Sequence, residues 1–539
     1  MKRRNFIQLG VLTGSIPLLS LEACASPAKD INSDASKEAQ PFELEEWTVA
    51  QLQSSMESGQ LTARSICEKY LKRIEEKDGE ENGLNSVLEL NPDALNIADA
   101  MDAERKTGTV RGPLHGIPVM IKDNIDTGDS MMTTAGSLAL MGAPAEKDAF
   151  IVTKLREAGA VLLGKTNLSE WANFRSTRSS SGWSGRGRQT KNPWAMDRSP
   201  CGSSAGSGAG VSGNMCAITI GTETNGSIVC PSSANGIVGI KPTVGLWSRA
   251  GIIPISHTQD TAGPMCRTVA DAAALLGPLT GMDSADEVTR ESKGKNYTDY
   301  SQFLDKDGLR GKTIGVLAGA FGYHEKVDEI MENTIRAMEE KGATLVRDVD
   351  VIGEGKYSGS GYEVLLYEFK DGLNKYLKNR TGVPVNSLAD IIQFNKDNAD
   401  QQMTYFEQEI LERAEKKGGL TEQEYLDALD TVLRVSREGI DAAIKQNKLD
   451  AIVGITGGPA WPIDLINGDH FGTGSSTPAA RSGYPNITVP AGFVHGLPVG
   501  LSFFAEAYTE GKLISLAYAF EQATKIRKAP TLKSTLDLP

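Results

Sequence analysis

Apolar residues along the chain follow two different patterns, and segments of the two kinds alternate. Apolar positions spaced three and four apart predict amphipathic helices at 48–58, 62–77, 92–107 and 148–158. Short continuous apolar runs predict buried strands at 117–121, 161–163, 312–317 and 450–455. Strands that alternate with helices indicate an α/β sheet with helices on both faces.

Residues 355–447 have a different character from the rest of the chain. The segment is rich in charged residues, and its stretch GYEVLLYEFKDGLNKYL has helical apolar spacing. One interpretation is a variable helical cap over a functional site, and the other is a solvated helical layer on the surface. A charged connector at 285–310 lies upstream, and no internal repeat is evident.

Residues 199–229 are rich in Gly and Ser and read SPCGSSAGSGAGVSGNMCAITIGTETNGSIV. Because the small residues run into the apolar stretch 217–220, we expect a folded, buried segment rather than a linker. Glycine allows backbone N–H groups to approach a ligand closely. A serine on such a turn can act as a nucleophile with its own oxyanion hole.

Several sequence blocks resemble the amidase signature family, in the order in which that family has them. They include GIPVMIKDN, CGSSAGS, GTETNGSI, GIVGIKPTVGLWSRAGIIP and SGYPNITVPAGF, and together they cover most of residues 45–530. WPIDLINGDHF and GTETNGSI are most similar to the bacterial peptide amidase branch. The resemblance implies one large catalytic domain, 42–539, built on a single mixed sheet of many strands.

The resemblance also implies a catalytic set of one lysine and two serines. By position in the family motifs, Lys122 is the base, Ser203 the proton relay and Ser227 the nucleophile. It implies a cis peptide bond before Ser203, and an oxyanion hole of backbone N–H groups from Thr224, Asn225, Gly226 and Ser227. Many family members have Gly where this chain has Asn225, so we expect this side chain to narrow the site.

The chemistry of amide cleavage agrees with these residue types. A serine hydroxyl needs a base to attack an amide and an acid to protonate the leaving amine. The chain has five histidines, and none lies in a recognisable triad motif. A lysine can replace histidine if burial keeps it neutral, and Lys122 directly follows the apolar run 117–121.

Three shorter motifs compete with this assignment. Gly202–Gly206 fits the α/β-hydrolase elbow with Ser204 as nucleophile, but Pro200 makes the preceding residues a poor strand. The sequence at 208–213 fits a dinucleotide-binding glycine pattern without a preceding strand. The S-x-x-K pattern at 292–295 lies in a charged stretch. We interpret all three as chance matches.

These observations predict an exported serine amide hydrolase that forms an acyl-enzyme without a metal or cofactor. Its expected substrates are small amides or the C-terminal amides of peptides. A fatty-acid-amide hydrolase, an esterase and a transamidase that handles charged tRNA are alternatives within the family. A surface lipoprotein that binds amides without turnover is an alternative of another class. The net charge of −13 argues against nucleic-acid binding.

The N-terminal residues predict export. Residues 1–25 combine Lys2, Arg3 and Arg4 with an apolar run, and the beginning resembles a twin-arginine signal. Leu21–Cys24 resembles a lipobox, which would leave an acylated Cys24 as a lipid anchor on a polar tether, 26–41. The alternative is ordinary cleavage after Ala25, and the polar tether favours the lipoprotein.

Cys24 aside, five cysteines remain, Cys67, Cys201, Cys216, Cys230 and Cys266. In a chain of this length we expect them to be small core residues rather than a disulfide framework. Cys201 and Cys230 flank the two serine motifs, so a bridge between these two stays open.

Overall fold

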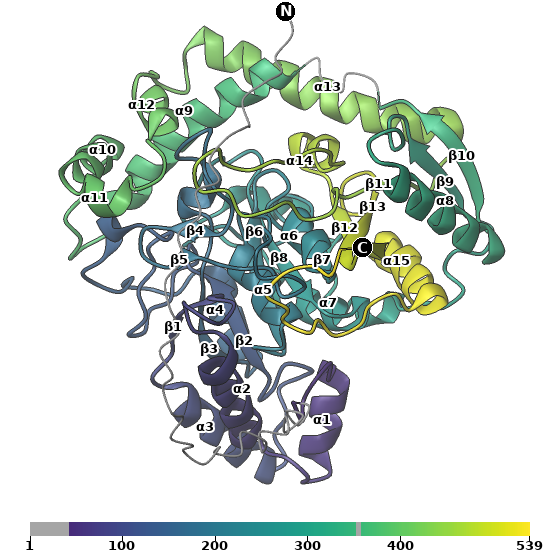
Figure 1. Ribbon diagram of the computed structural model, residues 1–539, viewed down its shortest axis with the longest axis horizontal. Coiled ribbons are helices and arrows are strands. Elements are labelled where there is room, and N and C mark those ends of the chain that lie inside the picture. The colour runs from purple at the N-terminus through teal and green to yellow at the C-terminus, as the bar shows by residue number, and fades with distance from the viewer. Residues whose placement is uncertain (1–41, 352–356, 539) are drawn as a thin grey trace, which may run out of the picture. The chain divides into compact units, whose positions relative to one another are not determined.

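A computed structural model describes residues 42–351 and 357–538 of the chain (Figure 1). Leu44–Pro539 form one compact unit. The predicted export signal, the lipobox at Cys24 and the tether 26–41 lie outside the described residues. Among those that are described, no helix is both long and apolar enough to cross a membrane.

Eleven strands of the described chain form one mixed sheet, with the order β1-β3-β2-β6-β8-β7-β12-β13-β11-β9-β10. The strands are β1 (Val87–Leu90), β2 (Pro118–Lys122), β3 (Val161–Thr166), β6 (Ile218–Glu223), β7 (Val238–Lys241), β8 (Thr261–Cys266), β9 (Thr313–Leu317), β10 (Thr344–Val349), β11 (Ala451–Ile455), β12 (Asn486–Val494) and β13 (Leu497–Phe504). Pairing is parallel at β3-β2-β6 and β11-β9-β10 and antiparallel elsewhere. A separate small ribbon joins β4 (Trp183–Ser184) to β5 (Arg188–Gln189).

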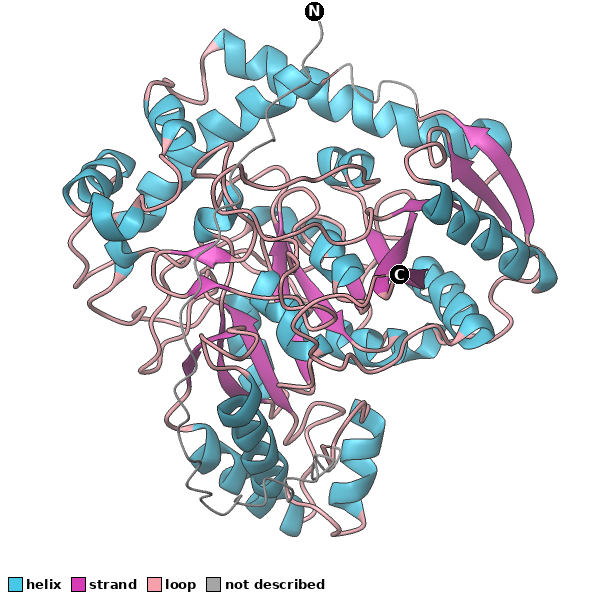
Figure 2. Ribbon diagram, viewed as in Figure 1, coloured by secondary structure: helices cyan, strands magenta, loops and turns pink. Residues whose placement is uncertain are grey.

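Helices cover both faces of this sheet, as Figure 2 shows. The helices are α1 (Val49–Glu57), α2 (Ala63–Lys77), α3 (Ala94–Lys106), α4 (Phe150–Glu157), α5 (Ala205–Ser212), α6 (Val229–Ala234), α7 (Val269–Leu276), α8 (Glu325–Glu340), α9 (Ser358–Leu377), α10 (Leu388–Asp397), α11 (Ala399–Gln402), α12 (Glu409–Glu415), α13 (Gln423–Asn447), α14 (Thr477–Ser482) and α15 (Glu510–Thr524). The small-residue helix α5 packs closely on β6 and β2.

The predicted fold class, a mixed many-stranded sheet covered by helices on both faces, is confirmed. The predicted strands appear as β2, β3, β9 and β11, and the predicted helices as α1–α4, with ends that differ by a few residues. Capping boxes at Thr48 and Thr62 fix the starts of α1 and α2, since each threonine accepts a backbone N–H of the first turn. Every residue of β2 and β3 is buried, which explains the apolar runs at 118–121 and 161–163.

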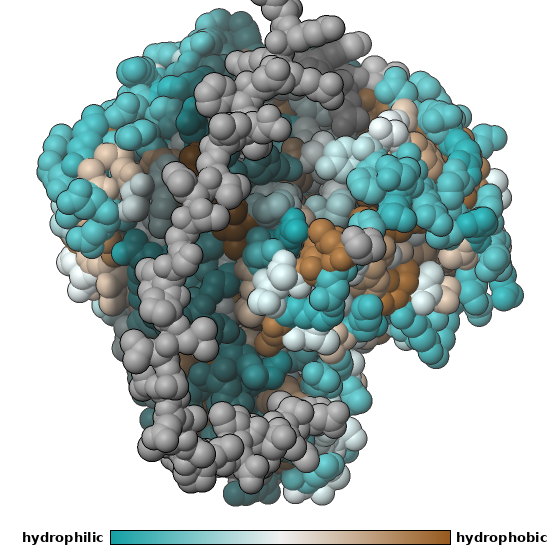
Figure 3. Space-filling view, viewed as in Figure 1, coloured by the Kyte–Doolittle hydropathy of each residue, from teal (hydrophilic) through white to brown (hydrophobic). Residues whose placement is uncertain are grey.

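Helices α9–α13 form the green arch at the top of Figure 1. Leu366, Phe369 and Leu373 of α9 pack into a core that also contains Trp171 and Phe174 from the body. α9 and α13 share a second apolar cluster. The surface over this arch is mainly hydrophilic in Figure 3. The arch therefore has a charged outer side and an apolar inner side that is continuous with the core of the body.

Candidate active site

Lys122 is the last residue of β2, the third strand of the sheet counted from β1, and its side chain is fully buried. Its Nζ lies 2.7 Å from Ser203 Oγ and 2.9 Å from Thr222 Oγ1. Burial lowers the pKa of Lys122 to about 7, although the nearby charges of Asp260 and Glu223 act in the opposite direction. A large fraction of the amine is therefore neutral near pH 7, so it can accept a proton.

Ser203 and Ser204 precede the first turn of α5, and both are fully buried. The Gly202–Ser203 peptide bond is cis, as the family resemblance implied. The Ser204 hydroxyl donates to the carbonyl of Thr222 at 3.0 Å and accepts its N–H at 3.2 Å. Ser204 is thus occupied in joining α5 to β6, whereas Ser203 contacts the buried amine.

Ser227 lies in the turn between β6 and α6, and its carbonyl accepts the Ser204 N–H at 3.2 Å. The turn has its left-handed residue at Gly226, with φ of +84°, where glycine is favoured. Within residues 42–351 and 357–538, we find no hydrogen bond donated by the backbone N–H groups of Asn225, Gly226 or Ser227. Such unpaired N–H groups beside a serine can stabilise an oxyanion.

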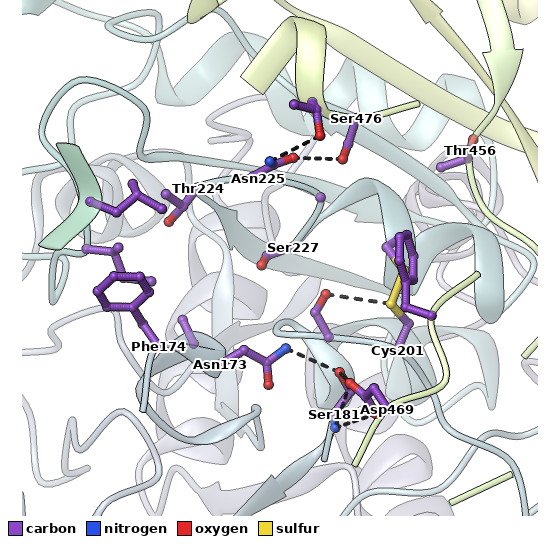
Figure 4. A pocket seen from close by; sticks show the side chains of 18 of the residues that line it. Asn173, Phe174, Ser181, Cys201, Thr224, Asn225, Ser227, Thr456, Asp469 and Ser476 are labelled. Atoms are coloured by element: carbon purple, nitrogen blue, oxygen red, sulfur yellow. Dashed lines mark hydrogen bonds between the residues drawn. A yellow bond between two sulfur atoms is a disulfide. The ribbon is translucent and has the colours of Figure 1, made fainter. Parts of the chain in front are cut away.

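The Asn225 side chain is held at the edge of this turn. Its Oδ1 accepts a hydrogen bond from Ser476 Oγ at 2.8 Å, and its Nδ2 donates to Thr477 Oγ1 at 3.3 Å. Both partners belong to the start of α14, so the asparagine ties the turn that contains Ser227 to that helix. Its side chain lines the pocket but points toward α14 in Figure 4, away from the Ser227 hydroxyl.

A pocket of about 360 Å³ opens above Ser227. In Figure 4 the Ser227 hydroxyl lies between Phe174 on one side and the Cys201 disulfide on the other. The lining residues are Ala172, Asn173, Phe174, Ser181, Cys201, Gly202, Thr224, Asn225, Gly226, Ser227, Cys230, Ile255, Leu365, Thr456, Trp461, Asp469, Phe471, Ser476 and Thr477. Because Leu365 belongs to α9, the arch contributes to the pocket wall, which is what the cap interpretation of 355–447 predicts.

A disulfide joins Cys201 to Cys230, with their Cα atoms 6.1 Å apart. The sequence left a bridge between these two cysteines open, and it forms because the fold brings Cys201, directly before Gly202, next to Cys230 in α6. Cys67, Cys216 and Cys266 are free and buried, as expected. The bridge therefore links the segments that carry the two serines.

The pocket wall at Trp171–Asn173 has an unusual backbone. Trp171, Ala172 and Asn173 are all left-handed, with φ between 50° and 69°. Consecutive non-glycine residues in this region are strained and need support from their surroundings. Arg175 provides this support. Its buried guanidinium pairs with Glu170 at 2.7 Å and donates hydrogen bonds to the backbone carbonyls of residues 402 and 406 in the arch.

Sequence reasoning missed several residues of the site. Thr222 accepts a hydrogen bond from the Lys122 amine. It lies within the quoted GTETNGSI motif, so its polar side chain in that motif could have marked it as a site residue. Asp469 lies in the quoted WPIDLINGDHF block and accepts hydrogen bonds from Ser181 and from the Trp461 indole, on the pocket wall. No sequence signal marked Ile255, and only the cap interpretation of 355–447 pointed to the segment that contains Leu365.

The competing motifs lie elsewhere or have other roles. The glycine pattern at 208–213 lies within α5 and at its end, with no strand before it. Ser292 hydrogen-bonds its own turn through the carbonyl of Thr289, and Lys295 lies over the ring of Tyr508. Neither residue is among those that line the pocket.

Comparison with known proteins assigns the chain to a family. The family model described as Amidase matches residues 65–514. The chain belongs to the amidase family. A solved structure of the native peptide amidase from Stenotrophomonas maltophilia is 48% identical, with a TM-score of 0.88, and the match covers 91% of this chain and 100% of that one.

Two curated relatives show the breadth of the family. A probable amidase of Arabidopsis thaliana is 43% identical over 500 residues, which are 91% of this chain and 92% of the relative. A glutamyl-tRNA(Gln) amidotransferase component from Thermoanaerobacter pseudethanolicus is 31% identical over 91% of this chain and 99% of its own length. This amidase is therefore a serine hydrolase of amide C–N bonds, and the alternative of a non-catalytic binding protein is not supported.

Proposed function

We propose that this amidase is an exported enzyme that hydrolyses small amides or peptide C-terminal amides through Lys122, Ser203 and Ser227. The observation that carries the proposal is the 2.7 Å hydrogen bond between the buried Lys122 amine and Ser203, beside a pocket that exposes the Ser227 hydroxyl. A buried neutral amine bonded to a serine has the arrangement of a general base with a relay.

The proton path begins at Ser227. As its oxygen attacks the amide carbon, its proton passes to Ser203, and Ser203 gives its own proton to the neutral Lys122. The resulting ammonium on Lys122 returns the proton through Ser203 to the leaving nitrogen. The C–N bond then breaks, ammonia or an amine departs, and the acyl group remains as an ester on Ser227.

The turn Thr224–Ser227 supplies the electrostatic part of the reaction. Its backbone N–H groups can donate to the oxyanion of the tetrahedral intermediate, and loss of one such donor typically costs about 100–1,000-fold in rate. Water then attacks the ester carbon, with Lys122 and Ser203 again taking and returning the proton. The cycle ends with the free acid and the regenerated serine.

The pocket supports a substrate that is larger than a simple amide. Its volume of about 360 Å³ is in the lower part of the range for ligand pockets. Phe174, Ile255 and Leu365 contribute apolar groups to its lining, and Asn173 and Asp469 contribute polar groups. A peptide end offers both apolar side chains and backbone polar groups. The likeness to the Stenotrophomonas peptide amidase supports the same substrate class.

Two features support export. The first is the N-terminal sequence, with its basic start, apolar run and lipobox at Cys24. The second is the Cys201–Cys230 disulfide, because such bonds persist mainly in oxidising compartments. An exported amidase meets peptides and small amides but not charged tRNA, which favours hydrolysis over the transamidase alternative.

The proposal is tested with a fluorophosphonate probe and a substrate panel. The probe should label wild-type enzyme at Ser227, identified by peptide mapping, and should not label a Ser227→Ala variant. Peptide amides, fatty-acid amides, aryl amides, amino-acid amides and esters are then compared by kcat/KM. Preference for fatty-acid amides or esters would replace the peptide assignment with those alternatives, and labelling at Ser204 would reject the catalytic set.

A further inference from the structure

Asp260 lies beside the oxyanion turn without lining the pocket. It directly precedes β8, whose first residue, Thr261, pairs with Glu223 at the end of β6. Because the two strands are antiparallel neighbours, the residue before Thr261 lies next to the residue after Glu223. That residue is Thr224, the first residue of the turn that contains Ser227.

The Asp260 carboxylate joins two segments of the site. Its Oδ1 accepts the Thr224 hydroxyl at 2.6 Å, and its Oδ2 accepts the N–H groups of Ile255 and Ser256 at 2.7 Å each. Thr224 begins the oxyanion turn, and Ile255 belongs to the apolar pocket wall. Charge-assisted hydrogen bonds of this length are the stronger kind, so the carboxylate fixes the turn against the wall.

A small cavity of about 10 Å³ lies beside both Asp260 and Thr222. It is lined in part by Asn124, Thr222, Glu223 and Asp260. The Thr222 hydroxyl that bonds the Lys122 amine also accepts the Asn124 side-chain amide at 3.0 Å. Asn124 Oδ1 and Glu223 Oε1 are buried and have no hydrogen-bond partner within the described residues. Thr222, which bonds the Lys122 amine, therefore lines the same cavity as Asp260.

The protonation state of Lys122 depends on the charges around its amine and on its burial. Asp260 and Glu223 raise the pKa of its amine and burial lowers it. Arg249 also acts on Asp260, but this guanidinium is paired with Asp286 at 2.7 Å. Burial raises the pKa of Asp260 to about 6, while its hydrogen bonds with Thr224, Ser256 and Ile255 favour the ionised carboxylate. When Lys122 takes up a proton, the new ammonium is buried and needs a nearby negative charge.

We propose that Asp260 is a positioning residue of the amidase, which holds the oxyanion turn through Thr224 and supplies the negative charge that stabilises the Lys122 ammonium formed during acylation. The inference rests on the proposed roles of Lys122, Ser203 and Ser227. Glu223 has a different task, since its Oε2 accepts the N–H groups of Ile228 and Val229 at the start of α6.

The test is the rate at which a fluorophosphonate probe labels Ser227, measured from pH 5 to 9. It reports activation of the nucleophile and needs no knowledge of the natural substrate. Asp260→Asn removes the charge and keeps an acceptor for the two backbone N–H groups. Thr224→Val removes the hydroxyl and keeps the charge, and Thr224→Ser restores the hydroxyl as the matched control.

In wild type the labelling rate should rise through the titration of Lys122. Asp260→Asn should move this acid limb to lower pH by about half a unit or more, because the amine loses a neighbouring negative charge. It should also lower the plateau by about ten-fold, because a weaker base activates the serine less. Thr224→Val should lower the plateau without moving the limb, and Thr224→Ser should restore the plateau.

The inference is overturned if folded Asp260→Asn, checked by circular dichroism and melting temperature, has the wild-type limb and plateau. If this variant does not fold, the comparison of Thr224→Val with Thr224→Ser tests the inference instead. A Thr224→Val variant whose labelling rate at high pH equals that of wild type overturns it. Failure of the proposed function has a different signature. Wild-type enzyme would then label at another residue, or Lys122→Ala would label at the wild-type rate, and both proposals would fall together.

Discussion

A single buried amine governs the expected pH response of this amidase. Among the residues that the structure describes, no carboxylate contacts Lys122, and the hydroxyls of Ser203 and Thr222 are its side-chain partners. Neutral hydroxyls stabilise an ammonium less than water does, so burial dominates and the pKa falls to about 7. A lysine at the surface would remain protonated at this pH and could not act as a base.

We predict that kcat/KM rises with pH around a midpoint near 7. The sign follows from the lowered pKa, because the active neutral form of Lys122 predominates above about 7 and is lost below it. The profile is measured with a peptide amide between pH 5 and 9. Lys122→Arg, which stays charged throughout, should be inactive across the range, and a flat wild-type profile would contradict the lysine base.

We predict that Ser227→Ala lowers kcat by at least about 10⁴-fold, because the nucleophile is lost while the rest of the site remains. Ser204→Ala should retain most of the activity, since its hydroxyl bonds the backbone of Thr222 rather than the buried amine. It should cost about 1–3 kcal/mol of unfolding free energy. Steady-state kinetics and urea unfolding of both variants decide the matter, and the reverse ranking would support the elbow motif.

At the scale of elements, the site depends on how segments are fastened together. β2 and β6 are parallel neighbours and place Lys122 beside Thr222, while α5 and α6 present the two serines. A disulfide between Cys201, directly before Gly202, and Cys230, the second residue of α6, closes the segment between them into a loop. Lys122 thus ends a strand, and the two serines lie in the segments that lead into helices.

We predict that loss of this disulfide destabilises the enzyme. Closing a loop with a sequence separation of 29 residues stabilises the folded state by about 3–4 kcal/mol in the chain-entropy model. A Cys201→Ala/Cys230→Ala double variant should lose this amount in urea unfolding. A phosphine reductant should lower the stability of wild type but leave the double variant unchanged. Equal stability of the two proteins would show that the bridge contributes nothing.

We predict that Leu365→Ala changes selectivity, because this α9 side chain lines the pocket with Phe174 and Ile255. The value of kcat/KM for amides with large apolar side chains should fall by about ten-fold relative to small amides. Leu366→Ala is the matched control, since Leu366 is buried in the same apolar cluster but is not a pocket residue. It should reduce stability alone, and equal selectivity of the two variants would exclude α9 from substrate recognition.

At the scale of the whole molecule, the proposed catalysis rests on the unit from Leu44 onward, whereas the proposed export rests largely on the N-terminal sequence. The unit from Leu44 onward holds the sheet, the arch and the pocket. The export proposal depends on residues 1–25 and on the disulfide. Stable anchoring by lipid needs more than one acyl chain, since each buried methylene adds only about 0.8 kcal/mol of membrane affinity.

We predict that the native enzyme begins at Cys24, carries lipid and fractionates with membranes. Mass spectrometry of the mature N-terminus tests this directly, and Cys24→Ala should release the enzyme into the soluble fraction. A chain that begins at Ser26 would instead indicate a soluble exported enzyme. An unprocessed Met1 on enzyme from the cytosol would contradict export and bring back the transamidase alternative.

The sequence by itself determined part of the regular elements and the identity of the candidate residues. Buried strands need apolar runs and amphipathic helices need apolar residues three and four apart, so the local pattern located β2, β3, β9 and β11. The motifs around Lys122, Ser203 and Ser227 marked the candidates because their residue types stand in the order and spacing of a known family. Sequence order is enough for such inferences.

Only the tertiary structure decided what each residue contacts. Lys122 and Ser203 are 81 positions apart, Thr224 and Asp260 are 36 apart, and Leu365 reaches the pocket from an arch with no recognisable motif. The Cys201–Cys230 bridge likewise depends on how α5 and α6 pack. Such contacts follow from strand order and helix packing across the whole sheet, which the local pattern of apolar and polar residues does not encode.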